Sequence, residues 1–245
     1  MIENNNKPFV FVVDDDPHIR QALHGLIRSI QLNVHTFATT EEFLNFKRPE
    51  APGCLVLDVR LPGLNGLDFQ HDLQRLKIDL PIIFITAHGD VPMSVRAIKA
   101  GAIEFLTKPF RHQDLVDAIN VGIERDRSHR QAMTSLLELQ SRFVSLTPRE
   151  RQIMHKVTGG GPNKQIAAEL KLSEFTVQVH RSHVMHKMKA KSLVDLVRMA
   201  DKLQDCEKRR SHGNDTLATR LIENRQVPEC AGLPPPVDFR ITYLR

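Results

Sequence analysis

The sequence has few of the features that mark secreted or membrane-spanning proteins. Its 245 residues include three cysteines, Cys54, Cys206 and Cys230, an odd number at wide spacing. Such a set excludes a disulfide framework and the close pairs of a zinc site, so free thiols are expected. No apolar run approaches the ~18 residues that span a bilayer. The first residues do not run from basic to apolar as in a secretory signal. We therefore expect a cytoplasmic protein without membrane contact.

The two halves of the chain differ in charge. Residues 1–125 hold 13 Lys and Arg against 16 Asp and Glu, whereas residues 126–245 hold 21 against 13. A basic half indicates a polyanionic partner such as DNA, although this signal is weak by itself. The length suits two modest domains of ~100–150 residues better than one.

The first half alternates strand-like and helix-like segments. Phe9–Val13, Cys54–Leu57 and Ile82–Ile85 are continuous apolar runs, as expected of strands buried on both faces of a parallel sheet. Between the first two runs, apolar residues recur at helical spacing: Ile19, Ala22, Leu23, Leu26, Ile27 and Ile30. This alternation predicts an α/β domain, a doubly wound parallel sheet, over about residues 5–125.

The second half lacks long strand-like runs. Residues 126–144 begin with a charged stretch and continue with apolar residues at helical spacing, which predicts a helical linker. Residues 145–205 are helical in pattern and are predicted to form an all-α domain of four helices. Residues 206–245 contain the polar segment KRRSHGND and the proline-rich LPPPVD, which predict a flexible tail outside the core.

Acidic side chains follow two of the predicted strands. Asp14–Asp16 come directly after the first apolar run, and Asp58 follows Cys54–Leu57. Because strand ends of an open parallel sheet meet at one edge, these carboxylates should gather there, and they would repel one another without a cation or added protons. Mg²⁺, a hard ion with oxygen ligands, fits such a set. Thr86 and Lys108 follow later strands and suit phosphoryl oxygens. A single aspartate here would more simply cap a helix; the whole set favours a site.

Four motifs give a resemblance to a known family. VVDDDPHIR, LVLDVRLPGLNG, FITAHGDVPM and EFLTKPF resemble the receiver motifs of FixJ/NarL-type response regulators of two-component systems, over roughly residues 8–125. The resemblance implies a flavodoxin-like fold with strand order 2-1-3-4-5. It implies that Asp58 is the phosphoacceptor and that Mg²⁺ is held by Asp14 (through water), Asp15, Asp58 and the backbone carbonyl of Arg60. It further implies phosphoryl contacts by Thr86 and Lys108, an aromatic switch at Phe105, and a helix cap at Asp16.

These implied roles form a phosphorylation mechanism. Asp58 would attack a phosphoryl group carried by a histidine of a sensor kinase, while Mg²⁺ and Lys108 neutralise its charge. The new phosphate would draw Thr86 inward, and Phe105 would fill the space left behind. The changed surface around 95–100 and 113–123 is expected to favour a homodimer by shifting the balance between two existing states.

Two enzyme classes fit the sequence poorly. Phosphatases of the haloacid dehalogenase type need a second aspartate two residues after the first, and that position holds Arg60. The G-x-S-x-G elbow of Ser/His/Asp hydrolases is absent. We therefore do not expect an enzyme. A second hypothesis stays open, in which a DNA-binding protein signals through receiver contacts without phosphate.

Helix start signals divide the region after residue 145. Thr147–Glu150 combines an N-cap, a proline at the first helical position and a glutamate three residues after the cap. The helix that starts here should end at the GGGP segment. Asn163 is predicted to cap a second helix, Ser173 a third that runs to about Met188, and Ser192 a fourth. The short turn between the second and third helices is typical of a helix-turn-helix, whose second helix enters the major groove.

This region also resembles a known family. LTPRERQIM, NKQIAAELKLSEFTVQVHRSHVMHKM and KSLVDLVRMA resemble the LuxR/NarL-type DNA-binding domain. The resemblance implies double-stranded promoter DNA as a partner, with RNA polymerase as a further one. Residues predicted to contact bases or phosphates are Lys164, Gln178, Val179, Ser182, His186, Lys187 and Lys189. Arg181 is predicted to pair with Glu150 rather than to read a base. Four helices that bind only protein remain the rival interpretation.

Three positions depart from the family pattern. Phe175 and Gln178 stand where relatives often carry lysines, and Gln178 can instead bond adenine through a bidentate pair. Lys171 replaces the usual glycine of the turn, where a left-handed conformation costs about 1 kcal/mol. These differences bear on the operator sequence rather than on the fold.

Three histidines raise the question of a metal site. His180, His183 and His186 follow one another at three-residue steps on one predicted helix. Each step drifts by ~60° around the helix, so all three cannot converge on one ion. A solvated or phosphate-facing role is therefore favoured for them.

Overall fold

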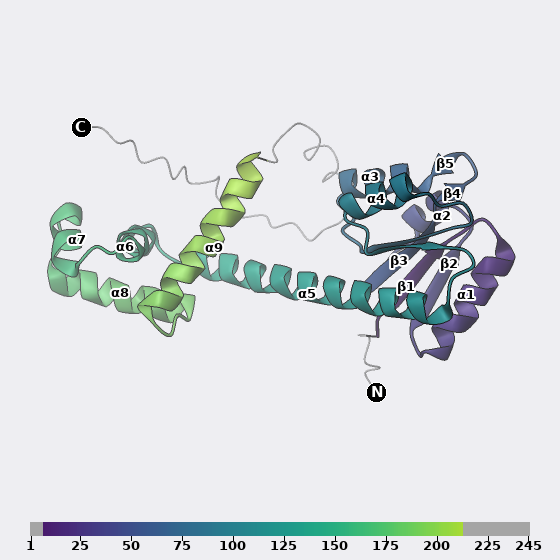
Figure 1. The fold of residues 1–245 in the computed structure, drawn as a ribbon. Coiled ribbons are helices and arrows are strands. Elements are labelled where there is room, and N and C mark those ends of the chain that lie inside the picture. The colour runs from purple at the N-terminus through teal and green to yellow at the C-terminus, as the bar shows by residue number, and fades with distance from the viewer. Residues whose placement is uncertain (1–6, 213–245) are drawn as a thin grey trace. The chain divides into compact units, whose positions relative to one another are not determined.

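The computed structural model describes residues 7–212 of the chain. The chain folds as two compact units that divide between Glu138 and Leu139. Figure 1 labels their helices and all of their strands except β6 and β7. Among residues 7–212, no helix is long and apolar enough to cross a membrane. Residues 213–245, which make up most of the predicted tail, lie outside the described residues.

A five-stranded parallel sheet forms the centre of the first unit (Figure 1). Its strands are β1 (Phe9–Val13), β2 (Asn33–Phe37), β3 (Gly53–Asp58), β6 (Ile82–Thr86) and β7 (Glu104–Thr107). They lie in the order β2-β1-β3-β6-β7, and every pairing is parallel. Counted among these five strands alone, the order is 2-1-3-4-5, so the predicted flavodoxin-like topology is confirmed. An unpredicted two-stranded hairpin, β4 (Arg60–Leu61) with β5 (Leu64–Asn65), follows β3.

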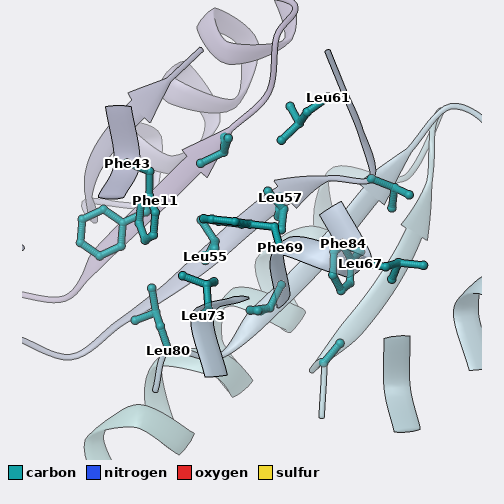
Figure 2. Packing of buried hydrophobic residues seen from close by; sticks show 14 of the residues in the cluster. Phe11, Phe43, Leu55, Leu57, Leu61, Leu67, Phe69, Leu73, Leu80 and Phe84 are labelled. Carbon is teal, nitrogen blue, oxygen red and sulfur yellow. The ribbon is translucent and has the colours of Figure 1, made fainter. Parts of the chain in front are cut away.

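Helices cover both faces of the sheet, and alternate strand residues point to opposite faces. The helices of this unit are α1 (Pro17–Ser29), α2 (Thr40–Asn45), α3 (Gly66–Arg75), α4 (Val91–Lys99) and the start of α5 (His112–Val144). Phe11, Leu55 and Leu57 pack with residues of α2, α3 and α4, including Phe43 and Phe69 (Figure 2). The intervening strand residues pack with α1 and α5. All six residues of β3 are buried, which explains its continuous apolar run.

Asp126 joins α5 to the start of the central strand. Its carboxylate is buried, and its Oδ2 accepts hydrogen bonds from the backbone N of Gly53 at 2.8 Å and from Nε of Arg130 at 2.7 Å. Nearby, Nε2 of His129 lies 3.3 Å from Oδ2 of Asp79. The residues that open the predicted linker are therefore helical and contact the sheet of the first unit and its loops.

The second unit contains α6 (Pro148–Thr158), α7 (Asn163–Leu170), α8 (Glu174–Met188) and α9 (Leu193–His212). Four helices were predicted, and the capping box of Thr147 with Glu150 is present at the start of α6. Ser173 caps α8, and α9 continues through His212, into the segment predicted as tail. The core of this unit consists of Leu139, Leu146, Ile153, Met154, Val157, Ile166, Ala167, Val177, Val184, Met188, Leu196, Ala200 and Leu203.

Two local predictions in this unit have different outcomes. Lys171 adopts the left-handed conformation expected of it, with φ 54° and ψ 50°. The predicted cap of α7 is wrong, because Pro162 occupies the N-cap position and Asn163 is the first helical residue. The Asn163 side chain is instead engaged by Arg181, whose Nη1 donates to Oδ1 at 3.2 Å.

Candidate functional site

Asp14 and Asp15, which follow β1, meet Asp58, the last residue of β3, at one edge of the sheet. Asp14 is fully buried and Asp58 nearly so, whereas Asp15 is exposed. One carboxylate oxygen from each of the three lies within 4.8 Å of the others. The parallel register of β1 and β3 brings them together, since Val13 lies beside Leu57. The predicted acidic cluster is therefore formed, although which of its residues hold an ion remains a prediction.

Lys108 bridges the two buried carboxylates. Its Nζ lies 2.7 Å from Oδ2 of Asp14 and 2.8 Å from Oδ2 of Asp58. Burial disfavours the ammonium, but the hydrogen bonds to the aspartates outweigh it and raise the pKa of Lys108. Burial raises the pKa of Asp14, even though Lys108 opposes this change. The backbone N of Lys108 donates to the carbonyl of Thr86 at 2.7 Å, which fixes the loop that carries the lysine.

The remaining oxygens of these aspartates are held by the backbone. Oδ1 of Asp14 accepts from the N of Asp16 at 2.9 Å, and Oδ1 of Asp58 accepts from the N of Arg60 at 3.0 Å. Asp16 in turn caps α1, accepting from the N of His18 at 2.8 Å, as predicted. The acidic side chains are therefore held in place before any ligand arrives.

Two residues that support this cluster were missed from the sequence. Arg20 donates from Nη1 to the carbonyls of Asp14 and Asp15, at 2.7 and 2.9 Å. Gly66 approaches β3 so closely that a Cβ there would lie 2.5 Å from the carbonyl oxygen of Asp58. The available signal for Gly66 was a glycine eight residues after the aspartate that ends the strand. Nothing in the sequence marked Arg20.

Thr86 and Phe105 lie on adjacent strands beside the acidic cluster. Thr86 is fully buried, and its Oγ1 accepts from the N of His88 at 3.2 Å. Phe105 is half-buried, with its ring 6.3 Å from that of Phe84. A Cβ on Gly89 would lie 2.8 Å from Cε1 of Phe105 and 3.1 Å from Cγ2 of Thr86. The two predicted switch residues thus share one tightly packed region.

The donor set at this edge fits a magnesium ion. Carboxylates of Asp14, Asp15 and Asp58 and the carbonyl of Arg60 are all oxygen donors, which a hard divalent ion prefers. The exposure of Asp15 leaves room for the waters that Mg²⁺ retains. Lys108 neutralises part of the acidic charge, so an ion has to share Asp58 with the ammonium.

In the second unit, the predicted partner of Glu150 is wrong. Arg181 does not pair with this buried carboxylate but reaches Asn163. Glu150 instead accepts from Nζ of Lys187 at 2.7 Å and from the N of Thr147 at 2.8 Å, both on Oε2. A helical wheel gives the face on which a residue lies, but not which long side chain reaches a given acid. Lys187 therefore has a structural bond that its predicted phosphate contact would have to share.

One side of α8 remains exposed. Val177, Val184 and Met188 are buried. Phe175 is 78% exposed. The exposed residues of the predicted DNA-contacting set are Lys164 on α7 and Gln178, Val179, Ser182, His186 and Lys189 on or just after α8. This exposed side is available to a partner, and its contacts with DNA remain predictions.

Comparison with known proteins finds one family in each of the two units. The model of the response regulator receiver domain matches residues 10–120, and that of bacterial regulatory proteins of the luxR family matches residues 144–200. Nodulation protein W of Bradyrhizobium diazoefficiens is 53% identical, over 82% of this chain and 88% of that protein. Transcriptional regulatory protein FixJ of Rhizobium meliloti is 41% identical, over 78% and 94%. The solved structure of response regulator StyR, 49% identical, matches with a TM-score of 0.72 over 80% of this chain and 99% of that one.

A receiver sheet with acidic residues at one edge, followed in the same chain by a helix-turn-helix unit, defines the class of DNA-binding response regulators. The chain belongs to the FixJ-type response regulators, with a receiver domain and a LuxR-type DNA-binding domain. It is thus a transcriptional regulator of the two-component type, as are its relatives.

Proposed function

We propose that this protein is switched on by phosphorylation of Asp58, with Mg²⁺ bound by Asp14, Asp15, Asp58 and the carbonyl of Arg60. The observation that carries the proposal is the arrangement of Lys108 between two buried carboxylates, beside the buried Thr86. Such a set can receive a phosphoryl group because a cation already faces the atoms that would carry the new charge. The function is regulatory, and turnover of a separate substrate is not part of it.

The residues of the chain perform the transfer by positioning. A carboxylate oxygen of Asp58 forms a bond to phosphorus as the bond from phosphorus to the histidine nitrogen of a sensor kinase breaks, and the histidine leaves as neutral imidazole with the proton that its other ring nitrogen already carried. The ammonium of Lys108 moves from the carboxylate of Asp58, which it contacts before phosphorylation, to an oxygen of the phosphoryl group. The hydroxyl of Thr86 donates a hydrogen bond to a second phosphoryl oxygen. A bound Mg²⁺ would neutralise the charge on the transferring group.

Phosphorylation then changes a surface of the first unit. Thr86 turns toward the phosphate, and the ring of Phe105 moves into the space that it leaves. This region adjoins α4, where Val91, Val95 and Ile98 are exposed by 73%, 44% and 46%. On α5, Val121 is 58% exposed. Burial of such apolar residues supports a homodimer that forms on phosphorylation, because association removes them from water.

The dimer would bind promoter DNA through α8. Gln178, Val179, Ser182 and His186 would face the bases, while Lys164, Lys187 and Lys189 would contact phosphates. RNA polymerase is the proposed downstream partner. For this mechanism we propose that the receiver, predicted over residues 5–125, extends through Asp126 and Arg130, that the rest of α5 links the two domains, and that the DNA-binding domain, predicted over 145–205, includes all of α9.

Replacement of Asp58 tests the proposal. Asp58→Asn should abolish incorporation of phosphate from a phosphorylated sensor kinase or from acetyl phosphate, since the amide is not a nucleophile. Asp16→Asn is the matched control, because Asp16 caps α1 with an oxygen that asparagine retains. Undiminished labelling of Asp58→Asn would refute the assignment.

A further inference from the structure

Three side chains of the second unit lie close together although they are distant in sequence. Glu150 stands at the start of α6, and His180 and His183 lie one turn apart on α8. One metal-ligating atom from each lies within 4.8 Å of the others. Nδ1 of His183 is 3.8 Å from Oε1 of Glu150, and the two imidazole rings have centroids 6.4 Å apart. The packing of α6 against α8 therefore places two imidazoles around one carboxylate.

His180 supplies an independent observation that points to a ligand. Its Nδ1 is buried, yet it has no hydrogen-bond partner among residues 7–212. A buried nitrogen without a partner is uncommon in folded proteins, because it has lost water and gained nothing in return. An ion coordinated through Nδ1 would satisfy this nitrogen directly.

Glu150 is prepared to serve as the anionic ligand. Burial opposes its ionisation, but hydrogen bonds from Lys187 and Thr147 outweigh it, and the pKa of Glu150 is lowered. Those two bonds are made to Oε2, while Oε1 is the oxygen nearer to His183. The carboxylate can therefore keep its structural bonds and still offer an oxygen.

We propose that Glu150, His180 and His183 bind a divalent transition-metal ion, of which Zn²⁺ fits the donors best. Two imidazole nitrogens and one carboxylate oxygen are ligands typical of Zn²⁺, with water completing the tetrahedron. Ligand atoms ~2 Å from a tetrahedral ion lie ~3.3 Å from one another. The site must therefore contract, and the side chain of His183, which is 59% exposed, is free to rotate toward the ion.

This site differs from one built on the three histidines of α8. His186 does not belong to the group, and its side chain is exposed. Three histidines at three-residue steps on one helix cannot converge on one ion. Here only two ligands come from α8, and the third, Glu150, comes from α6. His186 therefore provides a control on the same helix, with the same chemistry and outside the site.

Zn²⁺ titrated into the untagged full-length protein tests this proposal. Excess Mg²⁺ should be present to occupy the receiver. Calorimetry should show one saturable Zn²⁺ site that is lost or weakened at least about tenfold in His180→Ala and in His183→Ala. His186→Ala should bind as the unaltered protein does. An ion bound only by the folded unit should also raise its Tm, and this increase should vanish in the same two variants.

Circular dichroism of each variant without metal checks that it folds. Equal Zn²⁺ affinity in the His180→Ala/His183→Ala double variant would overturn the proposal, because the ion would then be bound elsewhere. Equal weakening by His186→Ala would also overturn it, as would the absence of saturable binding. None of these outcomes depends on phosphorylation or on DNA binding, so the test is separate from that of the proposed function.

Discussion

At the scale of single residues, the acidic site depends on a glycine that carries no chemistry. A Cβ at Gly66 would lie 2.5 Å from the carbonyl oxygen of Asp58 and 3.0 Å from Cα of Val59, and neither backbone atom can rotate away. Gly66→Ala should displace Asp58 and slow its phosphorylation by acetyl phosphate on the order of tenfold or more. Gly25→Ala is the control, because no heavy atom outside its chain neighbours and the backbone of its own helix lies within 4 Å of a Cβ built there. Equal rates in the two variants would show that the close contact is relieved without moving Asp58.

Titration of Glu150 should govern the acid stability of the second unit. Its pKa is lowered from the ordinary 4.5, because bonds from Lys187 and Thr147 outweigh the effect of burial. Since the folded state has the lower pKa, the stabilisation is fully present above the unfolded value and is lost as the pH falls through the folded one. Urea unfolding with a chelator at roughly pH 6 to 3 should show this loss, and Glu150→Gln should show a flatter profile. Parallel profiles for the two proteins would contradict the assignment.

At the scale of helices and strands, the turn between α7 and α8 has a residue that its conformation disfavours. Lys171 has φ 54°, a region that costs a side chain about 1 kcal/mol and glycine almost nothing. Lys171→Gly should therefore raise the stability of the second unit by up to ~1 kcal/mol, measured by thermal unfolding. Lys202→Gly, in the exposed interior of α9, should lower it by a similar amount. A loss of stability in both variants would mean that the turn is not strained.

The elements that sequence patterns predicted best are those buried on both sides. β1, β3 and β6 are almost entirely buried, so their residues form unbroken apolar runs. β2 and β7 lie at the edges of the sheet and are only partly buried, and their sequences NVHTF and EFLT lack such a run. Resemblance, rather than periodicity, supplied those two strands and the order of all five.

The candidate site shows the same division between local and distant information. The acids were predictable because they come at the end of apolar runs, after Val13 and after Leu57. The bond from Lys187 to Glu150 was not, because it joins residues 37 positions apart in sequence. The same holds for the grouping of Glu150 with His180 and His183, which depends on how α6 packs against α8.

At the scale of the whole molecule, phosphorylation should couple association to DNA binding. Val95→Glu would place a charge on the exposed apolar side of α4, and it should weaken the dimer formed with a phosphate mimic by at least about tenfold. Sedimentation would measure association, and footprinting would measure occupancy of paired half-sites. Leu76→Glu, at the equally exposed end of α3, is the control.

In this comparison, phosphate labelling should be normal in both variants. Occupancy of paired half-sites should rise with the phosphate mimic in Leu76→Glu but not in Val95→Glu. Equal occupancy of the half-sites by the unaltered protein with and without the mimic would favour the second hypothesis, in which the receiver signals without phosphate.

The buried carboxylate of Asp126 has a practical consequence for cutting the chain. It accepts hydrogen bonds from the backbone N of Gly53 and from Arg130. In an isolated receiver that stops at residue 125, the backbone N–H of Gly53, the first residue of β3, would therefore have lost its acceptor. Such a fragment should unfold more easily than one that continues to residue 130, by ~1–3 kcal/mol in urea. Equal stability of the two fragments would mean that solvent replaces this acceptor without cost. The boundary of the receiver domain is therefore set by the last residues of α5 that bond to its sheet, and it lies several residues beyond the boundary that the sequence pattern predicts.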